Sequence, residues 1–256
     1  MIDGDRGPEV IENPDGAGAF VIVCDHASNT VPFSYDLALP PDAINSHIGW
    51  DPGALPVARD LSERLDAPLL WPDISRLVID CNRPASAPDL IVTEGEGRPV
   101  PGNRALPEPE REKRLATIHT PYHAAIDAMI DRRLSAGLAT SLIAIHSFTP
   151  TWHGAPRPWQ IGIVFDEDRR LSAPLIDMLS ADATLTVGVN EPYSPADRVY
   201  YTMARHGSAR GLPAVMIEIR NDLIATEAGQ QEWAGRLAPM FEAIARQLPE
   251  SGHAAA

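Results

Sequence analysis

Short runs of apolar residues alternate along this chain with longer segments in which apolar residues recur every three or four positions. Buried strands are predicted from the runs at residues 19–24, 68–71, 77–81, 141–145, 160–165, 184–189 and 214–219. Helices are predicted from the spacing at residues 52–65, 110–134, 172–179 and 230–248. Because strands and helices alternate, we predict a single-domain α/β fold. Its three layers (α/β/α) have helices on both faces of a mostly parallel, mixed sheet.

Local signals refine several of these boundaries. Asp51 precedes Pro52, which predicts an N-cap followed by proline at the first helical position. Pro121 predicts a kink or a division in the long helix. Residues 87–109 are rich in Pro and Gly and lack periodicity, which is typical of a functional lid or binding loop. The two ends, residues 1–18 and 249–256, are expected to be poorly ordered tails.

Composition narrows the possible partners. A length of 256 residues allows one large α/β domain with a substantial core, and we find no internal repeat or linker. The formal net charge of −14 argues against nucleic acid and anionic membranes as partners. No apolar stretch could cross a bilayer, and the acidic N-terminal region is unlike a signal peptide, so a cytoplasmic location is expected. Dinucleotide and ATP motifs are missing, and the two cysteines suggest reduced thiols.

Residues 76–84 place an arginine at each end of an apolar run. Arg76 precedes the run, and Arg83 follows it next to Asn82. The planar donors of arginine suit carboxylates, so the stretch predicts a pocket that binds an anionic small molecule. Salt bridges at a strand edge are the alternative interpretation of the same arginines.

Polar side chains follow several predicted strands at their carboxyl ends, where ligands bind in open α/β sheets. These side chains are, in chain order, His26, Asn82, Arg83, His146, Glu218 and Arg220. Glu218 lies within an apolar run, and a carboxylate there is costly unless it is paired or coordinated. Two histidines and a carboxylate can hold a zinc ion with an open position, and a further carboxylate can move protons. A cationic donor completes such a site by polarising the scissile carbonyl.

Other candidate residues fit these chemistries less well. His119 and His123 are four apart on a predicted helix and share a face, but the glutamate of an HExxH motif is missing. We therefore favour a substrate-lining role for His123. Ser28 and Ser147 offer a serine-hydrolase alternative, although neither lies in a GxSxG motif.

The chain resembles the N-formylglutamate amidohydrolase family from about residue 20 to residue 245. The matching segments are residues 24–32, the surroundings of Asp51, and residues 75–84, 121–123, 145–147 and 216–220. This family is distantly similar to zinc carboxypeptidases and aspartoacylases. The resemblance therefore implies a zinc-carboxypeptidase-like fold and one Zn2+ per chain.

The resemblance also implies roles for individual residues. His26 and His146 would be zinc ligands, and Glu218 would be the general base and acid. Arg76 would polarise the carbonyl, whereas the substrate carboxylate would be held by Asn82 and Arg83.

The third zinc ligand is the point at which this chain departs from the related pattern. Carboxypeptidase-like sites have a glutamate ligand three residues after the first histidine, and Asn29 stands at that position here. We predict that Asp51 completes the site, with Asp25 as the alternative. Arg220 and His123 are predicted as further substrate contacts.

These expectations describe a cytoplasmic zinc-dependent amidohydrolase of amino-acid catabolism, acting as a monomer or homodimer. Its substrate would be a small anionic N-acyl amino acid such as N-formylglutamate, which gives formate and glutamate. The alternatives are a small peptidase, another N-acyl amino acid deacylase, or a non-catalytic protein that binds an acidic metabolite.

Overall fold

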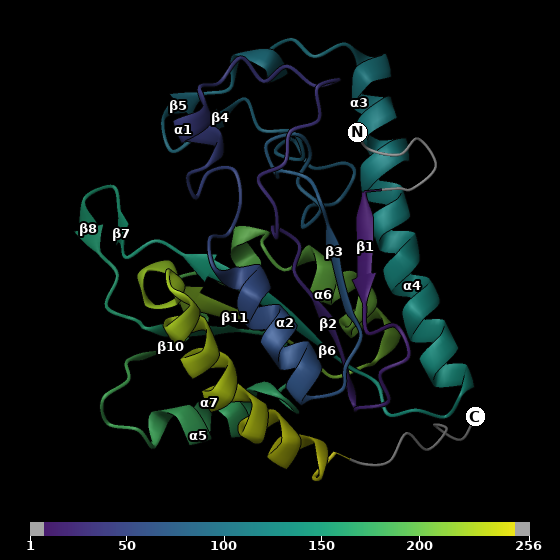
Figure 1. Ribbon diagram of the computed structural model, residues 1–256, viewed down its shortest axis with the longest axis vertical. Coiled ribbons are helices and arrows are strands. Elements are labelled where there is room, and N and C mark those ends of the chain that lie inside the picture. The colour runs from purple at the N-terminus through teal and green to yellow at the C-terminus, as the bar shows by residue number, and fades with distance from the viewer. Residues whose placement is uncertain (1–7, 249–256) are drawn as a thin grey trace.

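A seven-stranded sheet forms the middle layer of the protein, seen here in a computed structural model that describes residues 8–248 (Figure 1). The strands are β1 (Glu9–Glu12), β2 (Phe20–Val23), β3 (Leu69–Pro72), β6 (Ser141–Phe148), β9 (Ile161–Val164), β10 (Val187–Val189) and β11 (Ala214–Arg220). Their spatial order is β1-β3-β2-β6-β11-β9-β10. Only the β1–β3 and β9–β11 pairs of this sheet are antiparallel, which confirms the predicted mixed, mostly parallel sheet.

Helices cover both faces of this sheet. One face carries α2 (Ala54–Arg64), α5 (Ser172–Ser180) and α7 (Glu227–Ala245), and the other carries α4 (Thr120–Ser135) and α6 (Tyr201–His206). Helix α3 (Glu108–Arg114) extends the line of α4 beyond the sheet (Figure 1). A π-helical turn at Leu115–His119 joins α3 to α4, so the irregularity predicted at Pro121 lies just before that proline.

Smaller elements gather at the carboxyl ends of β2, β6 and β11. They are α1 (Pro41–Ile44), the hairpin of β4 (Glu94–Gly95) and β5 (Arg98–Pro99), and the hairpin of β7 (Thr151–Trp152) and β8 (Ala155–Pro156). Short 3-10 helices lie at Pro101–Asn103, Pro195–Asp197, Ser208–Arg210 and Asn221–Ile224. The predicted loop at residues 87–109 thus contains a hairpin and a helical turn.

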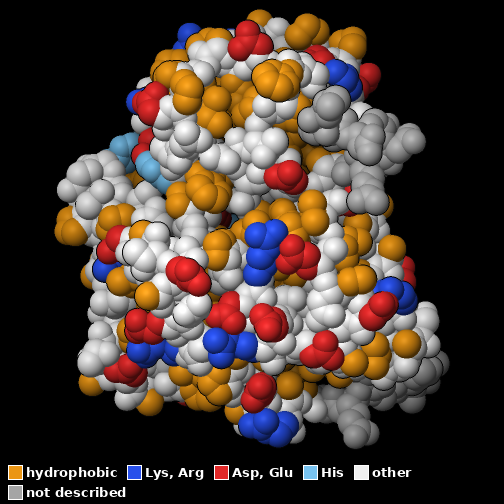
Figure 2. Space-filling model, in the orientation of Figure 1, with side chains coloured by type: hydrophobic (Ala, Val, Ile, Leu, Met, Phe, Trp, Pro, Cys, Tyr) orange, Lys and Arg blue, Asp and Glu red, His pale blue; other side chains and the backbone are white. Residues whose placement is uncertain are grey.

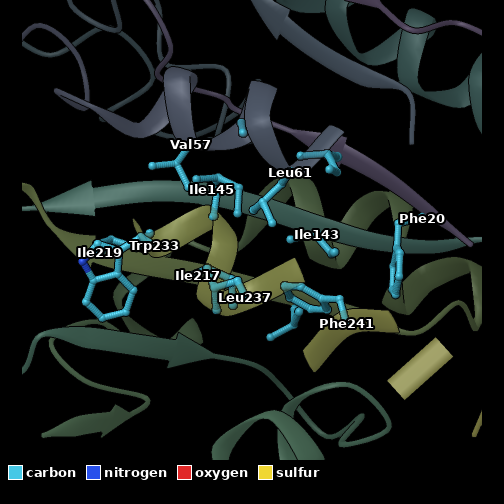
Figure 3. Close-up of a cluster of buried hydrophobic side chains, with 14 of the residues drawn as sticks. Phe20, Val57, Leu61, Ile143, Ile145, Ile217, Ile219, Trp233, Leu237 and Phe241 are labelled. Carbon is cyan, nitrogen blue, oxygen red and sulfur yellow. The ribbon is translucent and has the colours of Figure 1, made fainter. Parts of the chain in front are cut away.

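The two central strands separate their side chains cleanly by face. Ile145 of β6 and Ile217 of β11 point toward α2 and α7, where they pack with Leu61 and Leu237 (Figure 3). Burying each such side chain contributes roughly 1.5–3 kcal/mol. Because side chains alternate along a strand, the next residues of β6 and β11 point to the opposite face. That face therefore receives two residues predicted to act in the site, His146 and Glu218.

The strand predicted at residues 77–81 is wrong, because this apolar run forms a buried loop. Its main-chain groups bond to side chains instead of to a neighbouring strand. Asn103 Nδ2 donates to the carbonyl of Leu77 at 2.7 Å, and Arg114 Nη1 donates to that of Val78 at 2.9 Å. These donors satisfy the buried carbonyls, so the run can be buried without a ladder of hydrogen bonds.

Part of the predicted N-terminal tail is ordered structure. Strand β1 pairs with β3 in a register that places Val10 opposite Trp71, and Glu12 forms an ion pair of 2.9 Å with Arg59. The other portions of the two predicted tails, residues 1–7 and 249–256, lie outside the described residues.

The surface over α2 and α7 carries acidic and basic side chains that are interspersed, with scattered apolar ones between them (Figure 2). Among the helices that the structure describes, none combines the length and the apolar character that a membrane span requires.

Candidate active site

Three buried side chains meet at the carboxyl ends of the central strands. His26 follows β2, Asp51 lies in the turn before α2, and His146 belongs to β6. One ligand atom from each lies within 4.8 Å of the other two, which is close enough for a shared metal ion. The structure thus brings together the three residues that the sequence predicted as metal ligands.

Asp51 faces this cluster instead of capping the helix that follows it. Helix α2 begins at Ala54, and its N-cap is Gly53, whose φ of 83° lies in the left-handed region. The predicted start at Pro52 is therefore displaced. A main-chain hydrogen bond of 2.9 Å from Asp51 N to the carbonyl of His26 holds the two residues together. The Asp51 carboxylate is then free to approach His146 Nδ1, at 2.8 Å from Oδ2.

Each histidine has a second carboxylate behind its ring. His26 Nε2 lies 2.8 Å from Asp80 Oδ1, and His146 Nε2 lies 3.1 Å from Asp25 Oδ2. An ionised carboxylate only accepts hydrogen bonds, so this contact places a ring proton on Nε2 and turns Nδ1 of each histidine toward Asp51. The buried Nδ1 of His26 has no hydrogen-bond partner, and it lies 3.4 Å from Asp51 Oδ2. A cation between these atoms would satisfy them.

The charges around the cluster also favour a cation. Burial alone would raise the pKa of Asp51, but His26 and His146 lower it below its usual value. Burial lowers the pKa of His146, yet hydrogen bonds to Asp25 and Asp51 raise it to about 10. The carboxylates therefore stabilise positive charge at the place where the two Nδ1 atoms converge. Two imidazole nitrogens and one carboxylate oxygen form a donor set that suits zinc with an open coordination position.

Arg76 adjoins the cluster through the same carboxylate that supports His26. Its Nη2 lies 2.6 Å from Asp80 Oδ2, and its Nη1 lies 3.8 Å from Asp51 Oδ1. Because Asp80 contacts both His26 and Arg76, it fixes their relative positions. Sequence reasoning gave Asp80 no role, although its place four residues after Arg76 was the available signal.

Glu218 lies beside His146 on the neighbouring strand. The two residues are direct partners in the parallel register of β11 and β6. Glu218 is buried, and its Oε2 makes no hydrogen bond to another described residue. Burial raises the pKa of Glu218 to about 7, although His146 acts in the opposite direction. A carboxyl group of this kind can take up and release a proton near neutral pH.

These groups line a cavity of about 240 Å³. Seven predicted site residues contribute to its wall: His26, Asp51, Arg76, Asn82, Arg83, His146 and Glu218. The predicted binding loop also reaches it, because Val92 and Glu94 to Glu96 line its rim. His47 Nε2, 2.8 Å from Glu96 Oε2, ties the β4–β5 hairpin to the segment before α2. Trp152 of the other hairpin and Tyr193 add aromatic surface.

Asn82 and Arg83 differ in the donors that they leave available. Asn82 is used by main-chain groups, since its amide donates to Val199 O and accepts from Thr202 N at 3.0 Å. Arg83 donates from Nε to Asp89 at 3.0 Å and from Nη1 to the carbonyl of Asn82 at 2.9 Å. Nη2 of Arg83 takes part in neither of these bonds, while Asn82 supports the loop that carries Arg83.

Two predicted substrate contacts are not brought to this cavity. The ring of His123 is fully buried and bonds to the carbonyl of Cys81 at 3.0 Å. Arg220 forms an ion pair of 2.8 Å with Asp222. The cavity wall includes neither residue.

Asp25, the alternative metal ligand, lies behind His146. Its Oδ1 accepts hydrogen bonds from the Tyr122 hydroxyl at 2.9 Å and from Thr202 Oγ1 at 2.7 Å. All three side chains are buried. Sequence reasoning missed Tyr122 and Thr202, and no local pattern marks Thr202, which is 177 residues from Asp25.

Among the described residues, neither serine considered as a nucleophile forms a hydrogen bond with a histidine. Ser28 Oγ donates to Asp73 at 2.7 Å, and Ser147 Oγ donates to the carbonyl of Pro52 at 3.0 Å. A serine hydrolase needs a base within hydrogen-bond reach of its nucleophile, so the geometry does not favour that alternative.

Comparisons with known proteins agree with this geometry. A family model described as N-formylglutamate amidohydrolase matches residues 18–225. A gene product of Agrobacterium tumefaciens, known from its crystal structure, is 42% identical with a TM-score of 0.92; the match covers 94% of this chain and 96% of that one. An N-formylglutamate amidohydrolase from Ralstonia eutropha is 18% identical with a TM-score of 0.69, and the match covers 95% and 100%. The latter likeness shows a shared fold. No curated protein matches the chain significantly.

Proposed function

Because this chain belongs to the N-formylglutamate amidohydrolase family, we propose that it hydrolyses the N-acyl amide of an acidic amino acid. The substrate proposed is N-formylglutamate or a close analogue, and N-formylglutamate would give formate and glutamate. One observation carries the proposal: a buried carboxyl group with a raised pKa, Glu218, lies beside a metal-ligand triad in a cavity that also presents Arg76 and Arg83.

The proposed cofactor is one zinc ion per chain. His26 and His146 would bind it through their Nδ1 atoms, and Asp51 would bind it through a carboxylate oxygen. The fit rests on the unpartnered Nδ1 of His26 and on the two carboxylates that turn both Nδ1 atoms toward Asp51, where a cation would replace the Nδ1 proton of His146. When bound, zinc supplies a Lewis acid that polarises a carbonyl and lowers the pKa of water.

The protein's own groups supply proton transfer and charge stabilisation. Glu218 takes a proton from the attacking water as the water oxygen bonds to the acyl carbon. The same carboxyl group gives this proton to the amide nitrogen when the C–N bond breaks, so the products are a carboxylic acid and a free amine. Arg76, held by Asp80, stabilises the negative charge that develops on the carbonyl oxygen.

Substrate size and charge follow from the walls of the cavity. A volume of about 240 Å³ under the β4–β5 hairpin suits a small acyl amino acid better than a peptide. The remaining donor of Arg83 would bind a substrate carboxylate, since guanidinium and carboxylate groups form charge-assisted hydrogen bonds. The strong negative net charge of the chain makes this local donor important.

The direct test is hydrolysis of N-formyl-, N-acetyl- and N-succinyl-derivatives of glutamate and aspartate by the zinc-loaded protein. We expect one of these compounds to be cleaved, and Arg83→Ala to raise its KM at least about tenfold, the loss expected for one charged hydrogen bond. Arg220→Ala is the matched control, because Arg220 lies away from the cavity, and it should leave KM unchanged. A protein that binds zinc yet cleaves none of the six compounds would contradict the proposal.

A further inference from the structure

Three buried histidines outside the metal triad lie beneath the site loop, residues 80–83. His119 and His123 lie one turn apart near the start of α4, and His206 ends α6. Their exposed fractions are 3%, 0% and 0%, so each ring must find its hydrogen-bond partners within the protein. The proposed reaction uses none of the three.

The rings form hydrogen bonds that end on main-chain carbonyls of the site loop. His119 Nε2 lies 2.8 Å from the carbonyl oxygen of Arg83, and His123 Nε2 lies 3.0 Å from that of Cys81. His123 Nδ1 lies 2.8 Å from His206 Nε2. His206 Nδ1 lies 2.9 Å from Asp127 Oδ1, so the series of hydrogen bonds through His123 and His206 ends at a partly exposed carboxylate.

The chemistry of the partners fixes most of the protons in this series. A carbonyl oxygen only accepts hydrogen bonds, so His119 and His123 must each carry a proton on Nε2. The Nδ1 of a neutral His123 is then an acceptor, and His206 Nε2 donates to it. Because His206 Nδ1 also faces the Asp127 carboxylate, the His206 ring carries both protons in this arrangement; burial lowers its pKa, and Asp127 acts in the opposite direction. Burial lowers the pKa of His123 to about 2, which keeps that ring neutral. His123 is therefore a neutral donor to the site loop, and His206 holds it in the required tautomer.

The site loop needs such donors because it is not a strand. Residues 80–83 have no ladder partner in the sheet, and a buried carbonyl without a hydrogen bond destabilises the fold. Cys81 directly follows Asp80, the carboxylate that contacts both His26 and Arg76. The Arg83 carbonyl belongs to a residue that lines the cavity. The two histidines thus hold the two ends of the loop separately.

We propose that His123 and His119 are positioning residues of the site loop. His123 supports the part that serves metal binding, and His119 supports the part that serves substrate binding. His123, through Cys81, keeps Asp80 against the metal-ligating His26, while His119 keeps Arg83 in place for the substrate carboxylate. The assignment of the two roles rests on the proposed function. The alternative is that both rings only fill space in the core, in which case their hydrogen bonds would be irrelevant to the site.

The test compares leucine with glutamine at each position. Leucine fills the space without a donor, whereas the side-chain amide of glutamine can place a donor near the position of His Nε2. His123→Leu should weaken zinc binding by up to about tenfold, less than the loss of Asp80, the direct partner of His26, because His123 acts on that carboxylate only through the Cys81 carbonyl; competition with a chelating dye measures the affinity. His119→Leu should raise KM about tenfold, the loss of one hydrogen bond, with a smaller change in zinc affinity. Both glutamine variants should recover most of each loss.

Ile126→Val, on the same helix, controls for general packing and should change only the unfolding temperature. Equal zinc affinity and KM in the leucine and glutamine variants would overturn the proposal. If His123→Leu does not fold, nitrogen-15 NMR of the wild-type rings decides, because protons on Nδ1 instead of Nε2 of His119 and His123 would also overturn it. Zinc affinity and ring tautomers are measurable even if the protein cleaves none of the proposed substrates, so the two proposals can fail independently.

Discussion

Two faces of the same pair of strands show how this protein separates stability from chemistry. On the face toward α2 and α7, Ile145 and Ile217 are fully buried among apolar side chains (Figure 3). One residue further along each strand, His146 and Glu218 are buried nearly as deeply on the opposite face. Burial stabilises the first pair, whereas for the second pair it imposes a desolvation cost.

The desolvation cost of burying His146 is offset by hydrogen bonds to carboxylates, whereas that of Glu218 is offset less. His146 has two carboxylate partners, Asp25 and Asp51, which stabilise its charged form. Glu218 has no such partner for Oε2 among the described residues, and burial raises its pKa. A buried carboxyl group with a raised pKa, such as Glu218, lowers the free energy of unfolding when it is ionised. A residue that carries such a cost indicates a functional position.

The largest effect expected from this comparison is loss of turnover in Glu218→Gln. Glutamine keeps the size of the side chain but cannot accept and return a proton, so kcat should fall about 10²- to 10⁴-fold. Zinc content, measured by elemental analysis, should stay at one ion per chain, because Glu218 is not one of the three proposed ligands. Near-normal turnover in this variant would mean that another group moves the proton.

The same substitution should make the metal-free protein more stable than wild type at alkaline pH. The pKa of Glu218 rises from 4.5 in the unfolded chain to about 7 in the folded protein, so the folded state binds more protons between these values. Wild-type stability therefore falls relative to the variant as pH rises from about 4.5 to about 7, by up to about 3 kcal/mol, and levels off above that pH. Urea unfolding at pH 5 and pH 8 measures the difference, and a pH-independent gap between the two proteins would show that Glu218 does not titrate in this range.

A smaller effect, on zinc affinity, is expected from a change to Asp80, the carboxylate that contacts His26 on the side away from Asp51. Asp80→Asn weakens the contact that orients His26 and releases Arg76, so zinc affinity should fall about 10- to 100-fold. Asp222→Asn is a suitable control, since Asp222 pairs with Arg220 away from the cavity. Unchanged affinity in Asp80→Asn would show that His26 is oriented without this carboxylate.

The smallest effect should come from a substitution on the apolar face of the two strands, the face toward α2 and α7. Ile217→Val removes one buried methylene group next to Glu218 in sequence, which should lower the free energy of unfolding by about 0.5–1.5 kcal/mol. Because the side chain points away from the site, kcat and KM should remain within about twofold of wild type. A large loss of kcat without loss of stability would contradict the separation of the two faces.

Sequence patterns predicted most of the fold because apolar runs and helical spacing are local signals. They also located His26, His146 and Glu218, since each lies at or near the end of a strongly apolar strand. The loop at residues 77–81 was missed because its main chain is satisfied by side chains distant in sequence, such as Asn103 and Arg114. Its composition alone does not distinguish such a loop from a strand.

Supporting residues were harder to predict than ligands. Asp51 carries the signal of a helix cap, yet its carboxylate turns to the histidines, and only the three-dimensional arrangement shows this. Thr202 and Tyr122 bond to Asp25 across 177 and 97 positions of the chain. Contacts of this range arise from the packing of α4 and α6 on the sheet and leave no periodic trace in the sequence.

We propose that His26, Asp51 and His146 bind a metal ion on which amide hydrolysis depends. The most direct measurement is kcat for N-formylglutamate on a single preparation as isolated, after removal of metal by a chelator, and after addition of zinc. We predict that turnover is lost on chelation and returns with one equivalent of zinc per chain. Undiminished turnover in protein shown by elemental analysis to be free of metal would contradict it.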